Sequence, residues 1–141
     1  MRGSTEVAAI DANVIVRYVA ADHPAHHASA RALFQAVKAG TARVLCDPVN
    51  LAEVVFVLQK FYGVPRKRIG EELGALLQAP DFLVPDKARY LWALDMYAAG
   101  ELSFGDACAC AAALEDCEGR LYSFDRKLSG VPGVERIERA P

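Results

Sequence analysis

Four carboxylates are the residues of this chain whose types and spacing could do chemistry. They lie inside apolar segments or at the edges of such segments, at Asp11, Glu53, Asp106 and Asp125. Burying a carboxylate is costly unless something compensates its charge, and no comparably placed Lys or Arg accompanies these four. If the fold gathers them, their natural partner is a hard divalent cation, because all-oxygen sites suit Mg²⁺ or Mn²⁺, whereas zinc prefers His or Cys. We therefore expect a metal-dependent hydrolase that activates bound water against a phosphodiester.

Asp11 and Asp125 both follow expected strands directly, which is where parallel sheets bind their ligands. Each could instead cap a turn or a helix, because Asp is favoured in such positions. Asn13 is equally able to cap the helix that begins beside it, so capping does not require Asp11. We therefore favour a functional role for Asp11, and Asp125 copies its placement.

Glu53 and Asp106 are expected on helices. Glu53 shares a face with Phe56 and Val57, which is unusual for a solvated Glu, although the helix dipole alone favours Glu in the first turns. Asp106 follows Ser103 by three residues, as in a capping box, yet it also begins a buried stripe. Taken singly, function and structure are evenly balanced for both residues, so the prediction depends on the conjunction of all four acids.

Hydrophobic periodicity predicts strands that alternate with helices. The expected strands are 7–10, 44–46, 82–84, 121–124 and, at an edge, 134–137, and the expected helices cover 13–18, 30–37, 48–58, 69–77, 86–98 and 103–117. This order predicts an α/β fold, a three-layer α/β/α sandwich with a central parallel sheet of four to five strands covered on both faces. The acids at strand ends and on helices would then converge at one edge of the sheet.

Length and composition fit one globular domain covering residues 1–141, with 53% hydrophobic and 24% charged residues. The net charge of -2 excludes a chain that binds nucleic acid through its overall charge, so any such contact must come from a local basic patch. The apolar runs are short and interrupted by charge, so we expect no signal peptide or membrane span and a cytoplasmic location. The four cysteines are expected to be reduced thiols, and Cys108, Cys110 and Cys117, in an Ala-rich apolar run, are expected to be small core residues.

Four short stretches surround the acids in a recognisable order and spacing: residues 10–18 (IDANVIVRY), 50–54 (NLAEV), 104–107 (FGDA) and 123–128 (SFDRKL). At these residues the chain closely resembles the PIN-domain ribonucleases, specifically the toxins of VapBC-type toxin–antitoxin pairs. The resemblance implies a parallel sheet between helices, a divalent-metal site and endonucleolytic cleavage of RNA. It also implies a homodimer and a cognate antitoxin whose tail occupies the active-site groove.

The resemblance carries metal-ligand roles, direct or through water, onto the four acids. It implies that Asn13 orients Asp11 and that Ser123, at a position usually occupied by Thr, supports the site by hydrogen bonding. Two positions depart from the family pattern, because Ser103 stands where many members have a further Asp and Ala12 where many have Thr or Ser. These departures bear on the number of metal ions and on the strength of activity.

Basic and aromatic residues offer further candidates. Arg17, Arg126 and Lys127 lie close in sequence to the acids and are the best candidates for phosphate contacts, whereas residues 66–68 (RKR) are more typical of a solvated helix start. The histidines at 23, 26 and 27 lack the paired spacing of a metal site. The aromatic residues at 90, 92 and 97 could serve a dimer or antitoxin interface, or the core.

Two other functions remain open on the sequence alone. A phosphatase would use Asp11 as a nucleophile, but the second Asp of that pattern is Asn13 here, and only Lys127 could supply its catalytic Lys. A non-catalytic binding module would use the acids only to hold a basic segment of a partner.

Overall fold

The structure, a computed structural model, describes residues 6–141, and the first five residues of the expected 1–141 domain lie outside that range. The elements at its N-terminal end are β1 (Val7–Ile10), α1 (Ala12–Ala20), α2 (Pro24–Ala39), β2 (Arg43–Cys46), α3 (Pro48–Lys60), α4 (Arg66–Gln78) and β3 (Phe82–Leu83). They are followed by α5 (Lys87–Ala99), α6 (Phe104–Asp116), β4 (Arg120–Tyr122), a short 3₁₀ helix η1 (Arg126–Gly130) and β5 (Glu135–Ile137).

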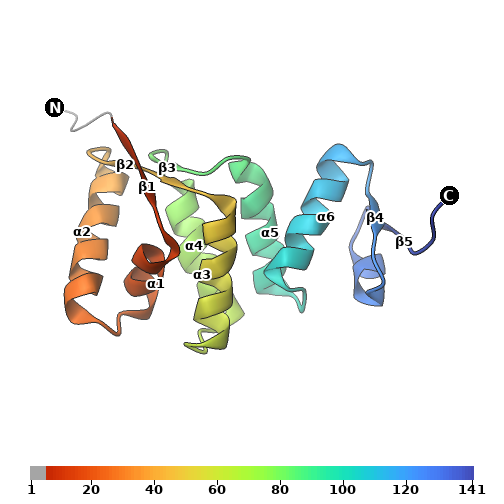
Figure 1. Cartoon of the computed structure of the whole chain (residues 1–141), viewed down its shortest axis with the longest axis horizontal. Coiled ribbons are helices and arrows are strands. Elements are labelled where there is room, and N and C mark those ends of the chain that lie inside the picture. Colours follow the sequence, from red (N-terminus) through yellow and green to blue (C-terminus); the bar gives the residue numbers. More distant parts are fainter. Residues whose placement is uncertain (1–5) are drawn as a thin grey trace.

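The prediction of an α/β fold with parallel strands is confirmed, because all five expected strands form and each pairs in parallel. The strands do not join into one sheet, however. In residues 6–141 they form a three-stranded sheet in the order β1-β2-β3 and a separate two-stranded sheet of β4 and β5. Figure 1 shows the two sheets toward opposite ends of an elongated molecule, with α5 and α6 between them.

The separation of the sheets follows from the path of α5 and α6. A short linker joins them, and α6 runs back beside α5 instead of crossing to β1 (Figure 1). Phe104 and Ala107 hold the start of α6 in the main core, and Arg89 of α5 pairs with Glu115 and Asp116 at the end of α6, at 3.1 Å and 2.5 Å. Because β4 begins only a few residues after α6, it is delivered to the far end of the molecule.

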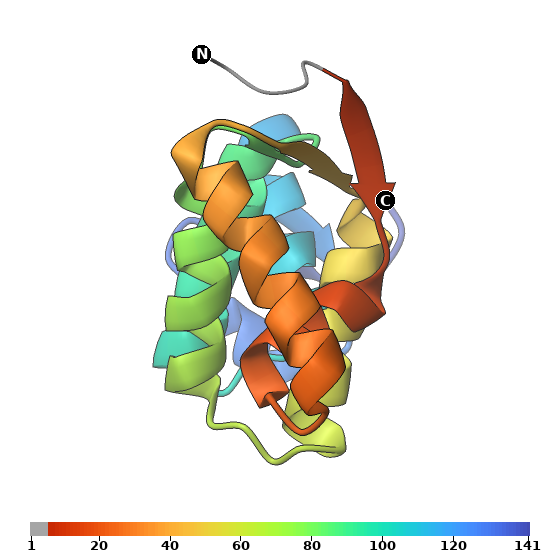
Figure 2. The same ribbon diagram turned by 90° about the vertical axis from the view of Figure 1, so that its left-hand side faces the viewer.

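The three-stranded sheet is covered by helices on one face only. Val44 and Cys46 of β2 are buried on the face of the sheet that packs against the helices. Figure 2 shows these helices on one side of β1 and β2. Side chains alternate across a strand, so the opposite face carries Val7 and Leu45, which are 43% and 39% exposed. The expected cover on both faces is therefore absent from this sheet within the part of the chain described, because α6 is held elsewhere.

Two hydrophobic cores correspond to the two sheets. The larger core lies among α1 to α5, the first sheet and the start of α6, where Phe104 and Ala107 are buried in it. Its fully buried side chains include Phe34, Leu51, Ile69, Leu73 and Tyr97. The smaller core joins Leu102, Cys110, Leu128 and Val131 beneath the second sheet. The second end of the molecule thus has little apolar burial of its own, which makes it the less stable end.

Gly70 permits the close packing of α4 on α5, because a Cβ at this position would lie 2.6 Å from Cβ of Ala98. The substitution Gly70→Ala should lower the free energy of unfolding by about 1–3 kcal/mol, the usual cost of overpacking. The matched control is Gly74→Ala on the same helix, where a Cβ meets nothing within 4 Å. It should raise the free energy of unfolding by up to about 1 kcal/mol through helix propensity. Urea denaturation of both variants checks the pair, and equal effects would contradict the packing argument.

Candidate functional site

Asp11 and Glu53 lie on a common cleft, as the sequence analysis expects. Asp11 comes directly after β1, and Glu53 lies on the second turn of α3. They line a shallow cleft of about 160 Å³ together with Asn13, Asn50 and apolar side chains of α1 and α3. The two carboxylates are exposed, so an ion or a phosphate can reach both of them from solvent.

Asp11 is also the N-cap of α1, where its side chain accepts a hydrogen bond from the backbone N–H of Val14 at 3.3 Å. The expectation that Asn13 could take over the cap is therefore wrong, because Asn13 lies inside the first turn of the helix. The cap fixes the Asp11 backbone at the carboxyl end of β1 and leaves one of its carboxylate oxygens outside the capping bond. Asp11 can therefore cap α1 and still offer a carboxylate oxygen to a ligand in the cleft.

Asp106 and Asp125 do not line this cleft. Asp106 lies in the first turn of α6, where its N–H donates to Oγ of the N-cap Ser103 at 3.0 Å, which is one of the two bonds of a capping box. Asp125 caps η1, accepts the N–H of Lys127 at 3.0 Å and pairs with its ammonium at 3.7 Å. Ser123 accepts the Asp125 N–H at 3.0 Å, so it does order the segment of Asp125.

The expected convergence of all four acids is therefore wrong for a single copy of the chain. Across residues 6–141, no three His, Cys, Asp or Glu side chains lie close enough together to hold a metal ion. The cause is the path of α6, which carries Asp125 with the second sheet to the end of the molecule opposite β1 (Figure 1).

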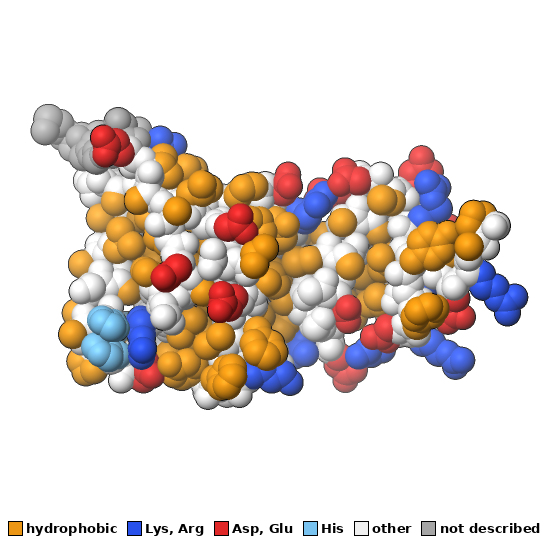
Figure 3. Space-filling view, in the orientation of Figure 1, with side chains coloured by type: hydrophobic (Ala, Val, Ile, Leu, Met, Phe, Trp, Pro, Cys, Tyr) orange, Lys and Arg blue, Asp and Glu red, His pale blue; other side chains and the backbone are white. Residues whose placement is uncertain are grey.

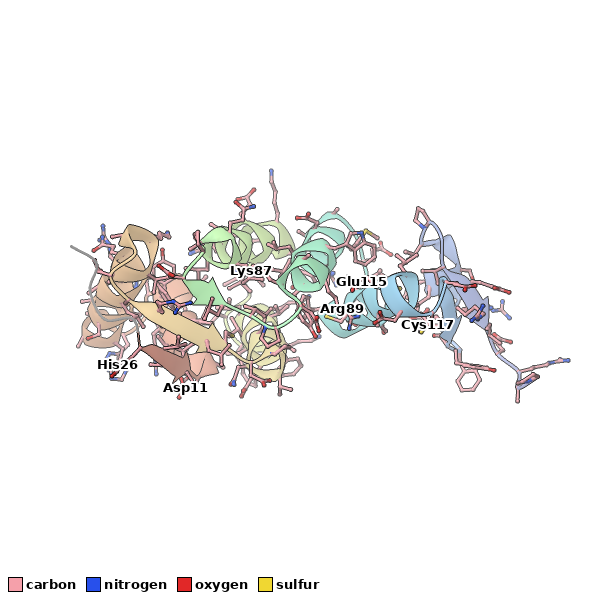
Figure 4. All side chains as sticks on the ribbon, turned by 90° about the horizontal axis from the view of Figure 1, so that it is seen from above. Asp11, His26, Lys87, Arg89, Glu115 and Cys117 are labelled. Carbon is pink, nitrogen blue, oxygen red and sulfur yellow. The ribbon has the colours of Figure 1, made fainter. Side chains whose placement is uncertain are left out.

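A second, larger cavity lies beside Asp11. It has a volume of about 400 Å³, and Arg17, His26 and Ser29 line it along with Asp11 and Asn13. Figure 4 shows Asp11 and His26 at the same end of the molecule. Asp11 therefore lies where two hollows meet. The smaller cleft contains the carboxylate of Glu53, and the larger cavity contains Arg17, His26 and Ser29.

Sequence reasoning missed Asn50, His26 and Ser29 as residues of these hollows. Asn50 precedes Glu53 by three positions, and residues spaced in this way lie on one helix face, so this signal was present. The sequence gives no comparable signal for His26 and Ser29, because α2 reaches Asp11 only through the packing of α1 on α2.

The basic residues expected to contact phosphate differ in their ion pairing and in their distance from Asp11. Arg17 pairs with Asp22 at 3.1 Å, and burial acts to raise the pKa of Asp22, but hydrogen bonds from Tyr62 and Arg17 outweigh it and lower that pKa. The pair is therefore intact at neutral pH. Arg126 and Lys127 are exposed at the far sheet, next to Asp125 and distant from Asp11.

The first and third residues of the 66–68 cluster have structural roles. Arg66 donates to the carbonyl oxygens of Tyr97, Glu101 and Leu102, and its guanidinium lies 4.6 Å from the centre of the Tyr97 ring. Arg68 donates to the carbonyl of Val19 at 2.9 Å. The expectation of a merely solvated helix start is thus wrong for Arg66, which holds the linker between α5 and α6.

The histidine and aromatic candidates are also mostly structural. The ring of His23 accepts the N–H of His26 at the start of α2, and the two rings stack 3.7 Å apart. Tyr97 is buried and donates to Gln59 at 2.8 Å, while Tyr90 and Trp92 pack partly against the core. Of the two alternatives for these aromatic residues, the structure favours the core.

The cysteines are free thiols of unequal exposure. Cys46 and Cys110 are buried, and the expected core position is confirmed for Cys110. It is wrong for Cys117, which is exposed because α6 ends there, near the second sheet (Figure 4). Burial raises the pKa of Cys46 and of Cys108 to about 11, so both remain protonated and unreactive at neutral pH.

Alkylation of the folded protein with iodoacetamide at pH 8 should therefore modify Cys117 first. We expect one label per chain by mass spectrometry before any second label, and none under the same conditions in Cys117→Ser. Modification of Cys46 before Cys117 would contradict the burial of that thiol.

The chain matches the PIN domain family over residues 8–134. It belongs to that family. A search among curated proteins found no match. PIN domains are generally metal-dependent nucleases, so the family supports a hydrolase that acts on nucleic acid and uses a divalent metal. No helix of residues 6–141 is both long enough and apolar enough to cross a membrane.

The donors of the Asp11 cleft fit the divalent metal that the family implies. Two carboxylates, Asp11 and Glu53, and two side-chain amides, Asn13 and Asn50, line the same cleft. Mg²⁺ is typically held by one or two carboxylates and completes its shell with water, and these oxygen donors suit Mg²⁺ or Mn²⁺. When bound here, such an ion would supply an activated water and stabilise charge on a phosphodiester.

The double role of Asp11 can be separated by two substitutions. Asn also caps helices, so Asp11→Asn should leave the metal-free stability within about 0.5 kcal/mol while weakening Mn²⁺ binding. Asp11→Ala should lose both the metal and the cap, and should lower the free energy of unfolding by about 1 kcal/mol. Calorimetric titration with Mn²⁺ and urea denaturation measure the two effects, and unchanged Mn²⁺ binding by Asp11→Asn would contradict the ligand assignment.

Proposed function

We propose that this chain is a divalent-metal-dependent endoribonuclease and the toxin of a VapBC-type toxin–antitoxin pair, with residues 1–141 forming a single cytoplasmic PIN domain. The observation that carries the proposal is the carboxylate cleft at the end of β1, where Asp11 and Glu53 share a surface that is open to solvent. In a member of the PIN domain family this is an acidic site at the carboxyl end of a parallel strand.

The residues in and beyond the cleft have distinct roles in this proposal. Asp11 and Glu53 hold Mg²⁺ or Mn²⁺. Asp106 and Asp125, which lie outside the cleft in a single copy, would serve as further ligands, direct or through water, once an assembly brings them to it. Asn13 and Asn50 orient the ligands by hydrogen bonding, and Ser123 does the same for Asp125.

RNA would lie across the ridge between the two hollows. Arg17 of the larger cavity would bind a phosphate in exchange for Asp22, and His26 and Ser29 would contact the neighbouring nucleotide. Arg126 and Lys127 would add phosphate contacts beside Asp125. A cognate antitoxin would silence the enzyme by placing a segment of its chain in this groove.

The phosphatase alternative loses its support. It needs a second Asp two residues after Asp11, and Asn13 stands there in any assembly of the chain. It also needs a Lys near Asp11, but within one copy Lys127 lies at the opposite end of the molecule and pairs with Asp125.

The test is cleavage of pooled tRNA and ribosomal RNA by the purified chain with Mg²⁺, with Mn²⁺ and with EDTA. Discrete fragments should require metal. Loss of an outer-shell partner alone typically costs about 10- to 100-fold, so loss of a direct ligand in Asp11→Asn or Glu53→Gln should lower the rate by at least about 100-fold. Glu71→Gln, an exposed acid on α4 away from both hollows, is the matched control and should leave the rate unchanged. Cleavage that persists in EDTA, or in Asp11→Asn, would refute the proposal.

A further inference from the structure

The strands β1 and β4 both have an edge without a hydrogen-bonded neighbour. Within the described chain, β1 pairs only with β2, and β4 pairs only with β5. The N–H of Ser123 donates to Ile137 and the N–H of Glu135 donates to Gly119, so β4 turns its odd-numbered peptide groups toward β5. Because alternate groups face opposite edges, those of Tyr122 face the open edge. Such an edge is a ready template for another strand.

Both open edges are accompanied by exposed apolar side chains. The uncovered face of the first sheet carries Val7 and Leu45, and near the other edge Tyr122 and Phe124 are 61% and 86% exposed. Figure 3 shows hydrophobic side chains at the surface of both ends of the molecule. Parallel strands are normally buried on both faces, and a two-stranded sheet is marginally stable by itself. Each end therefore has an open strand edge and exposed apolar side chains that the other end could cover.

One chain cannot bring its own ends together without breaking specific contacts. Figure 4 shows Arg89 of α5 and Glu115 of α6 side by side, and this ion pair ties the two helices together. Arg66 holds the linker between them through the carbonyl oxygens of Glu101 and Leu102, and it also donates to that of Tyr97 in α5. Folding β4 back onto β1 of the same chain would require both arrangements to open. A second copy can reach the open edge of β1 while every chain keeps the arrangement described here.

We propose that two copies of this chain exchange their C-terminal segments, so that β4 of each copy pairs in parallel with β1 of the other. The two half-sheets then form one sheet in the order β3-β2-β1-β4-β5. The exchange is reciprocal, because each copy offers one β1 edge and one β4 edge, so a closed two-fold dimer satisfies all of them.

The carboxylates favour the edge of β1 over the edge of β3. Asp11 directly follows β1 and Asp125 comes shortly after β4, so parallel pairing of these strands brings the two acids together. Pairing at β3 would leave them further apart by two strand spacings of about 4.8 Å each. The strand β3 also has only two residues and is soon followed by Pro85, so it offers a poor template.

The consequence for the site rests on the proposed function. In the exchanged dimer each metal site combines Asp11 and Glu53 of one copy with Asp125 of the second copy. Arg126 and Lys127 of the second copy come with it and place positive charge where the RNA phosphates would bind. A single copy holds two half-sites.

Cross-linking tests the exchange without any need for activity. In a Cys117→Ser background, Ala9→Cys on β1 and Tyr122→Cys on β4 are combined in one chain and treated with a short bis-maleimide. We expect a covalent dimer on a denaturing gel and, before treatment, a mass of twice 15.2 kDa by light scattering. A cross-link within one chain, or no cross-link in a folded protein, would overturn the proposal. The matched control pairs Ala39→Cys, exposed at the end of α2, with Tyr122→Cys and should not cross-link.

The open edge of β4 can be blocked without disturbing its bond to β5. Tyr122→Pro removes an N–H that faces the open edge, and proline is tolerated at such positions of edge strands. This variant should be a folded monomer, whereas Tyr122→Val, which keeps the N–H, should remain a dimer. A dimeric Tyr122→Pro would overturn the proposal.

Complementation then tests the shared site. Asp11→Asn and Asp125→Asn are each inactive, but a heterodimer of the two has one intact site. An equal mixture, refolded together, should regain about a quarter of the wild-type activity, because half of the dimers are mixed and each has one of two sites intact. No recovery beside an active wild type would refute the shared site. A wild type that cleaves no RNA would refute the proposed function, while the cross-linking result would still decide the exchange.

Discussion

Arg89 joins α5 to the end of α6 through two carboxylates, and Arg66 holds the linker between these helices through backbone carbonyls. These contacts set the direction in which the chain leaves the main core. Because α6 runs beside α5, the last two strands form a sheet of their own over a small core. The uncovered face of the first sheet and the separation of the acids follow from the same constraint.

The separation of the carboxylates avoids electrostatic repulsion among them. Several carboxylates within a few ångströms repel one another, and a divalent cation removes that repulsion. With Asp11 and Glu53 at one end and Asp125 at the other, a chain without metal does not bear the cost of crowding them. Assembly of the whole set and capture of the ion would therefore stabilise each other, since each supplies what the other needs.

The sequence predicted the elements well because their signals are local. The caps at Asp47-Pro48 and at Ser103, and the apolar runs of the strands, lie within a few residues of the ends that they define. The pairing of Asp11 with Glu53 was also predictable, because both follow from the first two strand–helix units. What failed was the convergence of Asp125 with them. That depends on the direction of α6, which is set by Arg66 and Arg89 contacts between residues 26 to 36 positions apart, and no local pattern reveals such contacts.

Completion of β1 by another copy, as proposed above, would make the number of whole sites depend on the concentration of the chain. At chain concentrations well below the dissociation constant, the concentration of dimer rises with the square of the total chain concentration. A tenfold dilution therefore lowers the concentration of dimer about a hundredfold. A cell that holds the chain scarce would contain mainly half-sites, each with Asp11 and Glu53 but without the segment of Asp125. The open strand edge would then set a chain concentration below which whole sites are scarce and above which their number rises steeply.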